Sequence, residues 1–138
     1  MPLKTKRWND SCEPDDGFRL LICRYRPRAL PKAKETWDEW CSALGPSKEL
    51  HADFYGKHGL PISLTEYRRR YLDEMKQQVE LIDELASLVA EGKTVTLLCS
   101  SACENEAHCH RSLLRELIEE RVKTRQAAPA STDGPETQ

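Results

Sequence analysis

Hydrophobic side chains recur every three or four residues through residues 63–92, which is the spacing of one face of an α-helix. The residues of this stripe are Tyr67, Tyr71, Met75, Val79, Ile82, Leu85 and Val89. Ser63 and Glu66 have the spacing of a capping box, and Gly92 follows the last hydrophobic position, where glycine commonly ends a helix. The pattern predicts one long helix that packs on the core.

A second strong pattern lies near the C-terminus. Residues 94–99 are β-branched or apolar without alternation, which predicts a strand buried on both faces. Hydrophobic residues at helical spacing then predict a last helix, and they are Leu113, Leu114, Leu117, Ile118 and Val122. The polar segment between them, CSSACENEAHCHR, is rich in thiols and imidazoles. It is the best candidate for a functional site.

Shorter patterns occupy the N-terminal half. Residues 18–24 predict a strand, and residues 3–8 predict a weaker one. One helical stripe is predicted over residues 37–44, with its tryptophans in the core, and one or two further helical turns over residues 47–54. The order of elements predicts an α/β fold, with a small, mainly parallel sheet and flanking helices.

We expect a single domain over residues 1–122 and a disordered tail over residues 123–138, which has no hydrophobic period. The helices between the second and third strands predict a parallel, right-handed crossover. The first strand is joined to the second by a short connection without a helix, which favours an antiparallel neighbour for it.

Charge and composition narrow the function. The 138 residues include 21 basic and 23 acidic side chains, a net charge of -2, which argues against a general nucleic-acid coat because that needs clustered positive charge. The sequence shows neither a secretory signal nor an apolar run near the roughly 20 residues of a membrane span. We expect a cytoplasmic protein with reduced cysteines and no membrane contact.

Two polar segments follow the ends of the two parallel strands. RYRPR carries Arg24, Arg26 and Arg28, and the second segment leads into the last helix near Arg111. Ligands of such sheets bind outside the carboxyl ends of the strands, so we expect these segments to converge. Arginines and a helix N-terminus together favour an anion, with Arg24, Arg28 and Arg111 as its ligands. We expect a nucleotide or another phosphorylated small molecule.

Several segments in this order resemble one known family. They are FRLLICRYRPRALP, the DEW segment, LGPSKEL, FYGK, EYRRRYLDEM, TVTLLCSSAC and HCHRSLL. The chain resembles the domain of unknown function 488 family, which is related to the YeaO-like proteins, from the first strand to about Val122. The resemblance implies a small α/β domain and assigns it no activity.

The chain differs from the YeaO-like pattern at two positions, where Cys23 replaces an aspartate and Ala29 replaces a glycine. Its cysteine-rich loop and HCHR helix start place it with another branch of the family. For that branch, the site residues implied by the resemblance are Arg24, Arg28, Cys99, Cys109, His110 and Arg111.

The cysteine-rich segment has three alternative chemistries. In the first, Cys109 near a helix N-terminus is a thiolate nucleophile, with His110 or His108 as acid or base and Cys99 as a second reactive or ordering thiol. A phosphatase-like match of His108, Cys109 and Arg115 is excluded, because the motif requires a phosphate-binding loop where the helix is predicted.

The second alternative is a zinc site formed by Cys99, Cys103, Cys109 and either His108 or His110, although paired C-x2-C knuckles are missing. The third is a reversible disulfide between Cys99 and Cys103. A non-enzymatic alternative is a single-stranded nucleic-acid module that uses the arginines, with Tyr25 or Tyr55 stacking on a base. We favour a small anionic ligand over nucleic acid, and the sequence carries no signal for oligomeric state.

Overall fold

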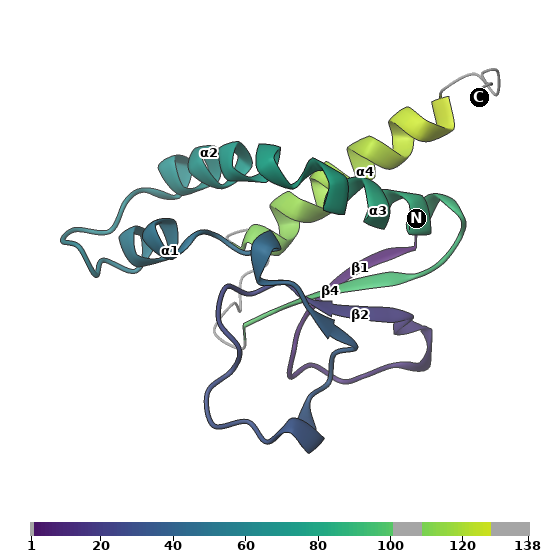
Figure 1. Ribbon diagram of the computed structural model, residues 1–138, viewed down its shortest axis with the longest axis horizontal. Helices are drawn as coiled ribbons and strands as arrows, with labels where there is room; N and C mark the ends of the chain where they lie inside the picture. Colours follow the sequence, from purple (N-terminus) through teal and green to yellow (C-terminus); the bar gives the residue numbers. More distant parts are fainter. Residues whose placement is uncertain (1, 101–108, 128–138) are drawn as a thin grey trace.

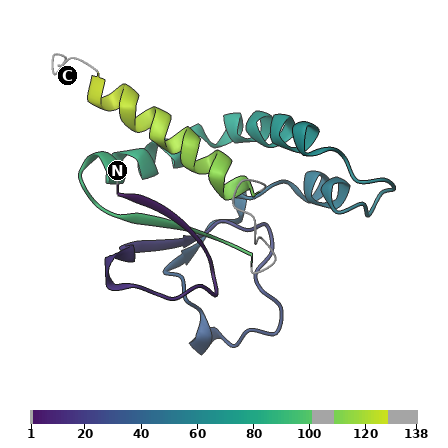
Figure 2. The ribbon, with the colours of Figure 1, turned by 180° about the vertical axis from the view of Figure 1, so that it is seen from behind.

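The computed structural model describes residues 2–100 and 109–127, which form a parallel sheet with helices on one face (Figures 1 and 2). Its strands are β1 (Leu3–Arg7), β2 (Phe18–Leu21), β3 (Glu39–Trp40) and β4 (Val95–Cys99), in the order β1-β4-β2-β3. Its α-helices are α1 (Lys48–Phe54), α2 (Leu64–Met75), α3 (Val79–Ala90) and α4 (His110–Ala127). The predicted α/β class is confirmed.

All three strand pairs are parallel, including β1 with β4. The antiparallel arrangement expected for the first strand is therefore wrong. β1 and β2 are not neighbours, because β4 lies between them and pairs with both. The short connection after β1 returns across one face of the sheet, so β2 starts at the same end of the sheet as β1 and runs parallel to it.

The main core lies between the helices and the other face of the sheet. Its residues from the sheet side include Leu20, Val95 and Leu97 of the strands and Ile22 just after β2, and its helical residues include Tyr71, Ile82, Leu114 and Ile118. A smaller apolar cluster lies on the opposite face, around Leu21, Leu98 and Cys99, with Trp8 and Trp37 packed against it. Helices cover only one face, and irregular chain covers the other (Figures 1 and 2).

The predicted long helix is two helices in the structure. Its start is confirmed, because Ser63 Oγ accepts a hydrogen bond from the Glu66 N–H at 3.1 Å. After Met75, however, the 3-10 helix Lys76–Gln78 separates α2 from α3. The side chains of this link are polar, and Val79, which was expected to face the core, is 42% exposed.

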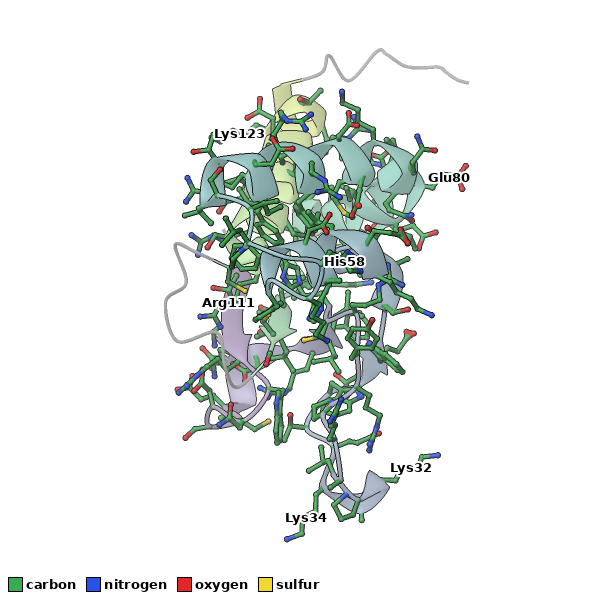
Figure 3. The ribbon with its side chains drawn as sticks, turned by 90° about the vertical axis from the view of Figure 1, so that its left-hand side faces the viewer. Lys32, Lys34, His58, Glu80, Arg111 and Lys123 are labelled. Atoms are coloured by element: carbon green, nitrogen blue, oxygen red, sulfur yellow. The ribbon has the colours of Figure 1, made fainter. Side chains whose placement is uncertain are left out.

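The helix expected over residues 37–44 is also wrong. β3 and a 3-10 helix, Ser42–Leu44, occupy this segment, and Trp40 is 44% exposed rather than in the core. Figure 3 shows Lys32 and Lys34 at the tip of the loop before β3, at the end of the molecule opposite the helices. The helical turns expected near residues 47–54 are confirmed as α1.

The last helix continues to Ala127, five residues past the expected end of the domain at residue 122. Residues 128–138 of the expected tail lie outside the described part of the chain. None of the helices over residues 2–100 and 109–127 has the length and hydropathy needed to cross a membrane.

Candidate functional site

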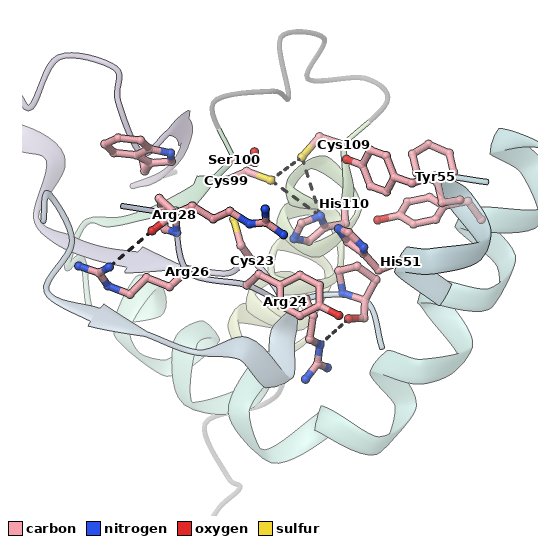
Figure 4. Close-up of a pocket in the computed structure, with 16 residues that line it drawn as sticks. Cys23, Arg24, Arg26, Arg28, His51, Tyr55, Cys99, Ser100, Cys109 and His110 are labelled. Carbon is pink, nitrogen blue, oxygen red and sulfur yellow. Dashed lines mark hydrogen bonds between the residues drawn. The ribbon is translucent and has the colours of Figure 1, made fainter. Parts of the chain in front are cut away.

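A pocket of about 330 Å³ lies at the carboxyl ends of β2 and β4 (Figure 4). The chain that follows β2 lines it from Cys23 to Arg28, and Cys99 and Ser100 line it at the end of β4. The start of α4 contributes Cys109 and His110. The sequence predicted that the arginine segment and the thiol segment meet at one edge of the sheet, and the structure brings them together in this pocket.

Two thiols lie together in the wall of this pocket. Cys109 Sγ is 3.0 Å from Cys99 Sγ, and both residues are buried. His110 Nδ1 lies 3.9 Å from each of the two sulfur atoms (Figure 4). Three groups that can exchange protons or bind soft metals therefore face one another.

The other ring nitrogen fixes the orientation of His110. Nε2 lies 2.8 Å from the backbone oxygen of Ile22, and because a carbonyl only accepts, Nε2 carries the proton of this hydrogen bond. In neutral His110 the lone pair is then on Nδ1, which faces the thiols. The ring also packs against Tyr71, at 5.4 Å between centroids.

Tyr71 is a neutral support for this ring. Its hydroxyl donates to the backbone oxygen of Leu44 at 2.7 Å, and the residue is completely buried. Burial raises the pKa of Tyr71 well above its ordinary value, and the neighbouring Tyr67, Cys109 and Cys99 raise it further. Tyr71 therefore holds His110 without supplying a charge.

Cys109 immediately precedes α4, and its sulfur accepts a hydrogen bond from the Arg111 N–H at 3.5 Å. The Ser112 N–H donates to the Cys109 carbonyl at 3.2 Å. Free N–H groups and the positive end of the dipole at a helix start both stabilise negative charge. At this position the N–H groups favour negative charge on the sulfur, whereas burial of Cys109 in the apolar cluster with Leu21 and Leu98 opposes it.

The three arginines of RYRPR differ in their surroundings. Arg24 Nε donates to the Pro46 carbonyl at 2.7 Å, and Arg26 pairs with Glu35 at 2.7 Å. Arg28 is exposed and has no hydrogen bond or ion pair within the described residues. Its side chain extends towards Cys99 and His110 in Figure 4. Arg28 is thus the arginine best placed to meet an anion in the pocket.

Arg111, the third predicted anion ligand, does not line the pocket. It is 6% exposed, and its charge, after the N–H and guanidinium of Arg7, helps to lower the pKa of Asp10. Successive helical residues turn by about 100°, so a helix that presents Cys109 and His110 to the pocket directs Arg111 elsewhere.

An aromatic wall is the part of the site that the sequence did not predict as a unit. His51 lies between Tyr25 and Tyr55, at centroid distances of 5.0 Å and 4.6 Å. Tyr25 and Tyr55 are about half exposed, at 49% and 53%. Tyr25 and Tyr55 were candidates for stacking on a base, whereas nothing singled out His51. The i, i+4 spacing of His51 on α1 and Tyr55, the residue directly after α1, is the sequence signal that could have identified it.

The same pocket holds a group of potential metal ligands. The ligand atoms of Cys99, Cys109 and His110 all lie within 4.8 Å of one another. Of the zinc set expected from sequence, Cys103 and His108 lie outside the described residues, and so does Cys103 of the expected Cys99–Cys103 disulfide. Within the described residues, His110 is the imidazole that accompanies the two thiols.

Comparisons with known proteins identify relatives over most of the chain. The family model DUF488-N3a, described as the active DUF488-N3 subclade, matches residues 3–122. The uncharacterized protein YeaO of Escherichia coli (strain K12) is 33% identical over 108 residues, which are 78% of this chain and 90% of YeaO. The uncharacterized protein Rv3073c of Mycobacterium tuberculosis (strain H37Rv) is 29% identical over 116 residues, covering 84% and 92%. No solved structure matches the chain.

Proposed function

The chain belongs to the DUF488 family, in its DUF488-N3a subclade, and we propose that it binds a small phosphorylated ligand, such as a nucleotide, beside a reactive cysteine. One observation carries the proposal. The thiol pair Cys99–Cys109 lies within reach of His110 in a pocket that Arg28 also lines.

Each residue has a distinct role in this proposal. Cys109 is the nucleophile, because its sulfur accepts an N–H at the start of α4. His110 Nδ1 exchanges a proton with the thiol pair, since Nε2 is occupied by the Ile22 carbonyl. Once Cys109 has lost its proton, Cys99, whose sulfur lies 3.0 Å away, is the thiol placed to donate to the thiolate and orient it. Arg28 holds the anion, and Arg24, which also lines the pocket, adds positive charge.

The aromatic wall supports a nucleotide over a simple phosphate ester. Tyr25 and Tyr55 expose apolar ring surface at the pocket, and a base can stack on such a surface. The pocket volume of about 330 Å³ is within the range of small-molecule sites. A ligand with a phosphate at one end and a ring at the other matches both walls.

Iodoacetamide alkylation at several pH values tests this proposal. We expect Cys109 to react at least about tenfold faster than the exposed Cys12 at neutral pH, and to be protected by inorganic phosphate or AMP. Cleavage after Glu106 and Glu116 isolates Cys109 in a peptide that contains no other cysteine, so its rate can be followed by mass spectrometry. Slower reaction than Cys12, or equal rates with and without both anions, would contradict the proposal.

A second candidate function is a metal centre, which the grouping of Cys99, Cys109 and His110 favours. Zinc sites with three protein ligands of the types Cys, Cys and His leave a fourth position for water or substrate. The hydrogen bond from His110 Nε2 to Ile22 is the kind of outer contact that orients a metal-binding imidazole. Zinc would make both thiols ligands, so this candidate excludes the free nucleophile.

Metal analysis of protein purified without chelator separates the two candidates. The metal centre predicts about one zinc per chain, lost in Cys109→Ser and kept in Cys12→Ser. It also predicts that iodoacetamide modifies Cys109 only after a chelator is added. Metal-free protein with a rapidly alkylated Cys109 would remove this candidate and support the nucleophile.

Nucleic-acid binding has less support from the contacts of the basic residues. On α2, Arg69 pairs with Glu66 of the same helix and Arg70 pairs with Asp53 of α1, so carboxylates neutralise part of the expected basic face. Arg26 is engaged by Glu35 in the same way. We therefore keep the small anion as the proposed ligand.

A further inference from the structure

We infer that Cys99 and Cys109 form a thiol–disulfide couple that small hydroperoxides oxidise. The inference deepens the proposed function, because oxidation would switch off the same pocket. The two sulfur atoms are 3.0 Å apart, about 1 Å more than the S–S bond of a disulfide. Closing this gap requires a small side-chain movement rather than a rearrangement of the fold.

The backbones that carry the two thiols are held in place by separate contacts. The Cys99 carbonyl accepts from the Trp8 N–H at 2.8 Å, at the end of the central strand β4. Cys109 is fixed by the first hydrogen bonds of α4. A disulfide between them would therefore join two ordered elements in the wall of the pocket.

The pairing is selective among the cysteines that the structure describes. Cys12 is exposed, whereas Cys23, Cys99 and Cys109 are buried and Cys41 is intermediate. Within residues 2–100 and 109–127, no hydrogen bond joins the sulfur of Cys12, Cys23 or Cys41 to another sulfur atom, although Cys23 packs in the same apolar cluster as Cys99 and Cys109. A hydroperoxide small enough to enter the pocket would meet Cys99 and Cys109 together. Cys23 lines the same pocket, so it is the competing thiol that the cross-linking test must include.

The chemistry proceeds in two balanced steps. With hydrogen peroxide, the Cys109 thiolate attacks one oxygen, an S–O bond forms, the O–O bond breaks, and the leaving hydroxide takes a proton to become water. Cys99 then loses its proton, through His110 Nδ1, and attacks the sulfenic acid sulfur of Cys109. The S–S bond forms as the S–O bond breaks, and a second water leaves. The two thiols are oxidised by two electrons, and the peroxide is reduced.

The couple can be tested in the full-length chain with Cys103→Ser, which removes the thiol nearest in sequence to the pair. Cleavage after Glu91, Glu104, Glu106 and Glu116 puts Cys99 and Cys109 on different peptides. After brief treatment with hydrogen peroxide, we expect these peptides to be joined, two hydrogen atoms lighter than their sum, and separated again by dithiothreitol. Five free thiols should fall to three, because the cross-link consumes two.

Two controls make the outcome decisive. Oxidation in guanidinium should remove the preference for this pair, since the preference depends on folding. In Cys103→Ser/Cys99→Ala, the Cys109 sulfenic acid should persist and be trapped by dimedone, because its partner is missing. Accumulation of sulfinic acid at Cys109 in Cys103→Ser without a cross-link, or equal cross-linking to Cys23 or Cys41, would overturn the inference.

Failure of this couple can be distinguished from failure of the proposed function. Protection from iodoacetamide by phosphate or AMP is measured on reduced protein and needs no second thiol. The cross-link is measured by mass and needs no anion. A cross-link without anion protection would leave the couple standing and contradict the phosphate pocket. Anion protection without a cross-link would leave the phosphate pocket standing and contradict the thiol–disulfide couple.

Discussion

His110 at the start of α4 donates from Nε2 to the backbone oxygen of Ile22, 2.8 Å away and directly after β2. This bond ties the helix that presents Cys109 to the strand that leads into the arginine segment. It also leaves Nδ1 facing both thiols. One side chain therefore sets the relative position of the two halves of the pocket.

Replacing this histidine should affect both stability and thiol reactivity. In His110→Phe the buried Ile22 oxygen loses its donor, which should lower the free energy of unfolding by about 1–3 kcal/mol. The alkylation rate of Cys109 should fall at least about tenfold, because the acid-base group is gone. His58→Phe, at an exposed histidine paired with Asp53, is the matched control and should keep that rate. An unchanged rate in His110→Phe would refute the role of the imidazole.

Arg28 and Arg26 offer a matched comparison for anion binding. Arg28→Ala should weaken protection by phosphate about tenfold or more, since a charge-assisted hydrogen bond contributes about 1.5–3 kcal/mol. Arg26→Ala should change it less, because Glu35 already engages that guanidinium. The measurement is the phosphate concentration that halves the alkylation rate of Cys109. Equal effects of both substitutions would show that only the summed charge matters.

The sequence predicted which segments form the pocket better than it predicted which side chains line it. RYRPR and the cysteine segment meet because the carboxyl ends of parallel strands share one edge, and this rule needs no knowledge of side-chain packing. Arg111 was misplaced because its direction depends on the first residue of α4. A shift of one residue turns a side chain by about 100°, and the sequence pattern does not fix a helix start that closely.

One error in the fold has a tertiary cause, and a second concerns a break that no local sequence signal marks. Trp37, Trp40 and Leu44 have helical spacing, yet backbone hydrogen bonds to β2 hold residues 38–41 extended, with the Cys41 N–H donating to the Leu21 oxygen at 2.8 Å. The indole of Trp40 caps the Cys23 carbonyl at 2.8 Å instead of entering the core. The break between α2 and α3 contains neither glycine nor proline, so the sequence has no local signal for the end of a helix there.

Gly45 should be essential to the shape of the pocket. A Cβ at this position would lie 2.6 Å from the backbone nitrogen of Arg24 and 2.9 Å from the backbone oxygen of Ile22. Both distances are shorter than a Cβ can approach a backbone atom. Gly45→Ala should therefore displace the segment after β2, lower the free energy of unfolding by about 1–3 kcal/mol and weaken phosphate protection. Denaturant unfolding and the alkylation assay measure the two effects.

Gly92→Ala is the control for a conformational effect alone. Gly92 has a φ of 89°, but no atom lies within 4 Å of its would-be Cβ. Its replacement should destabilise the fold by about 1 kcal/mol through backbone strain, with no change in phosphate protection. Loss of protection in both variants would indicate general destabilisation instead of a specific change at the pocket.

Asp16 anchors a cluster of charges on the face of the sheet that the helices leave uncovered. Its carboxylate is 1% exposed and accepts hydrogen bonds from Lys4 Nζ at 2.7 Å, from Lys6 Nζ and from Arg19. Burial alone would raise the pKa of Asp16, but the hydrogen bonds from Lys4, Lys6 and the Glu13 N–H outweigh it and hold the pKa far below its usual range. The folded protein therefore stabilises the ionised form of the Asp16 carboxyl group.

Asp16→Asn should lower the free energy of unfolding by about 3 kcal/mol at neutral pH, because it leaves the buried Arg19 without its carboxylate. A carboxylate with a depressed pKa stabilises the fold above its unfolded pKa of about 3.9, and this stabilisation is lost as the pH falls towards the folded value. The difference between the two proteins should thus be constant from about pH 5 to 8 and shrink below about pH 4. Asp15→Asn, at an exposed carboxylate, should show neither effect. Urea unfolding across this pH range tests the assignment, and a difference that stays constant down to pH 2 would contradict it.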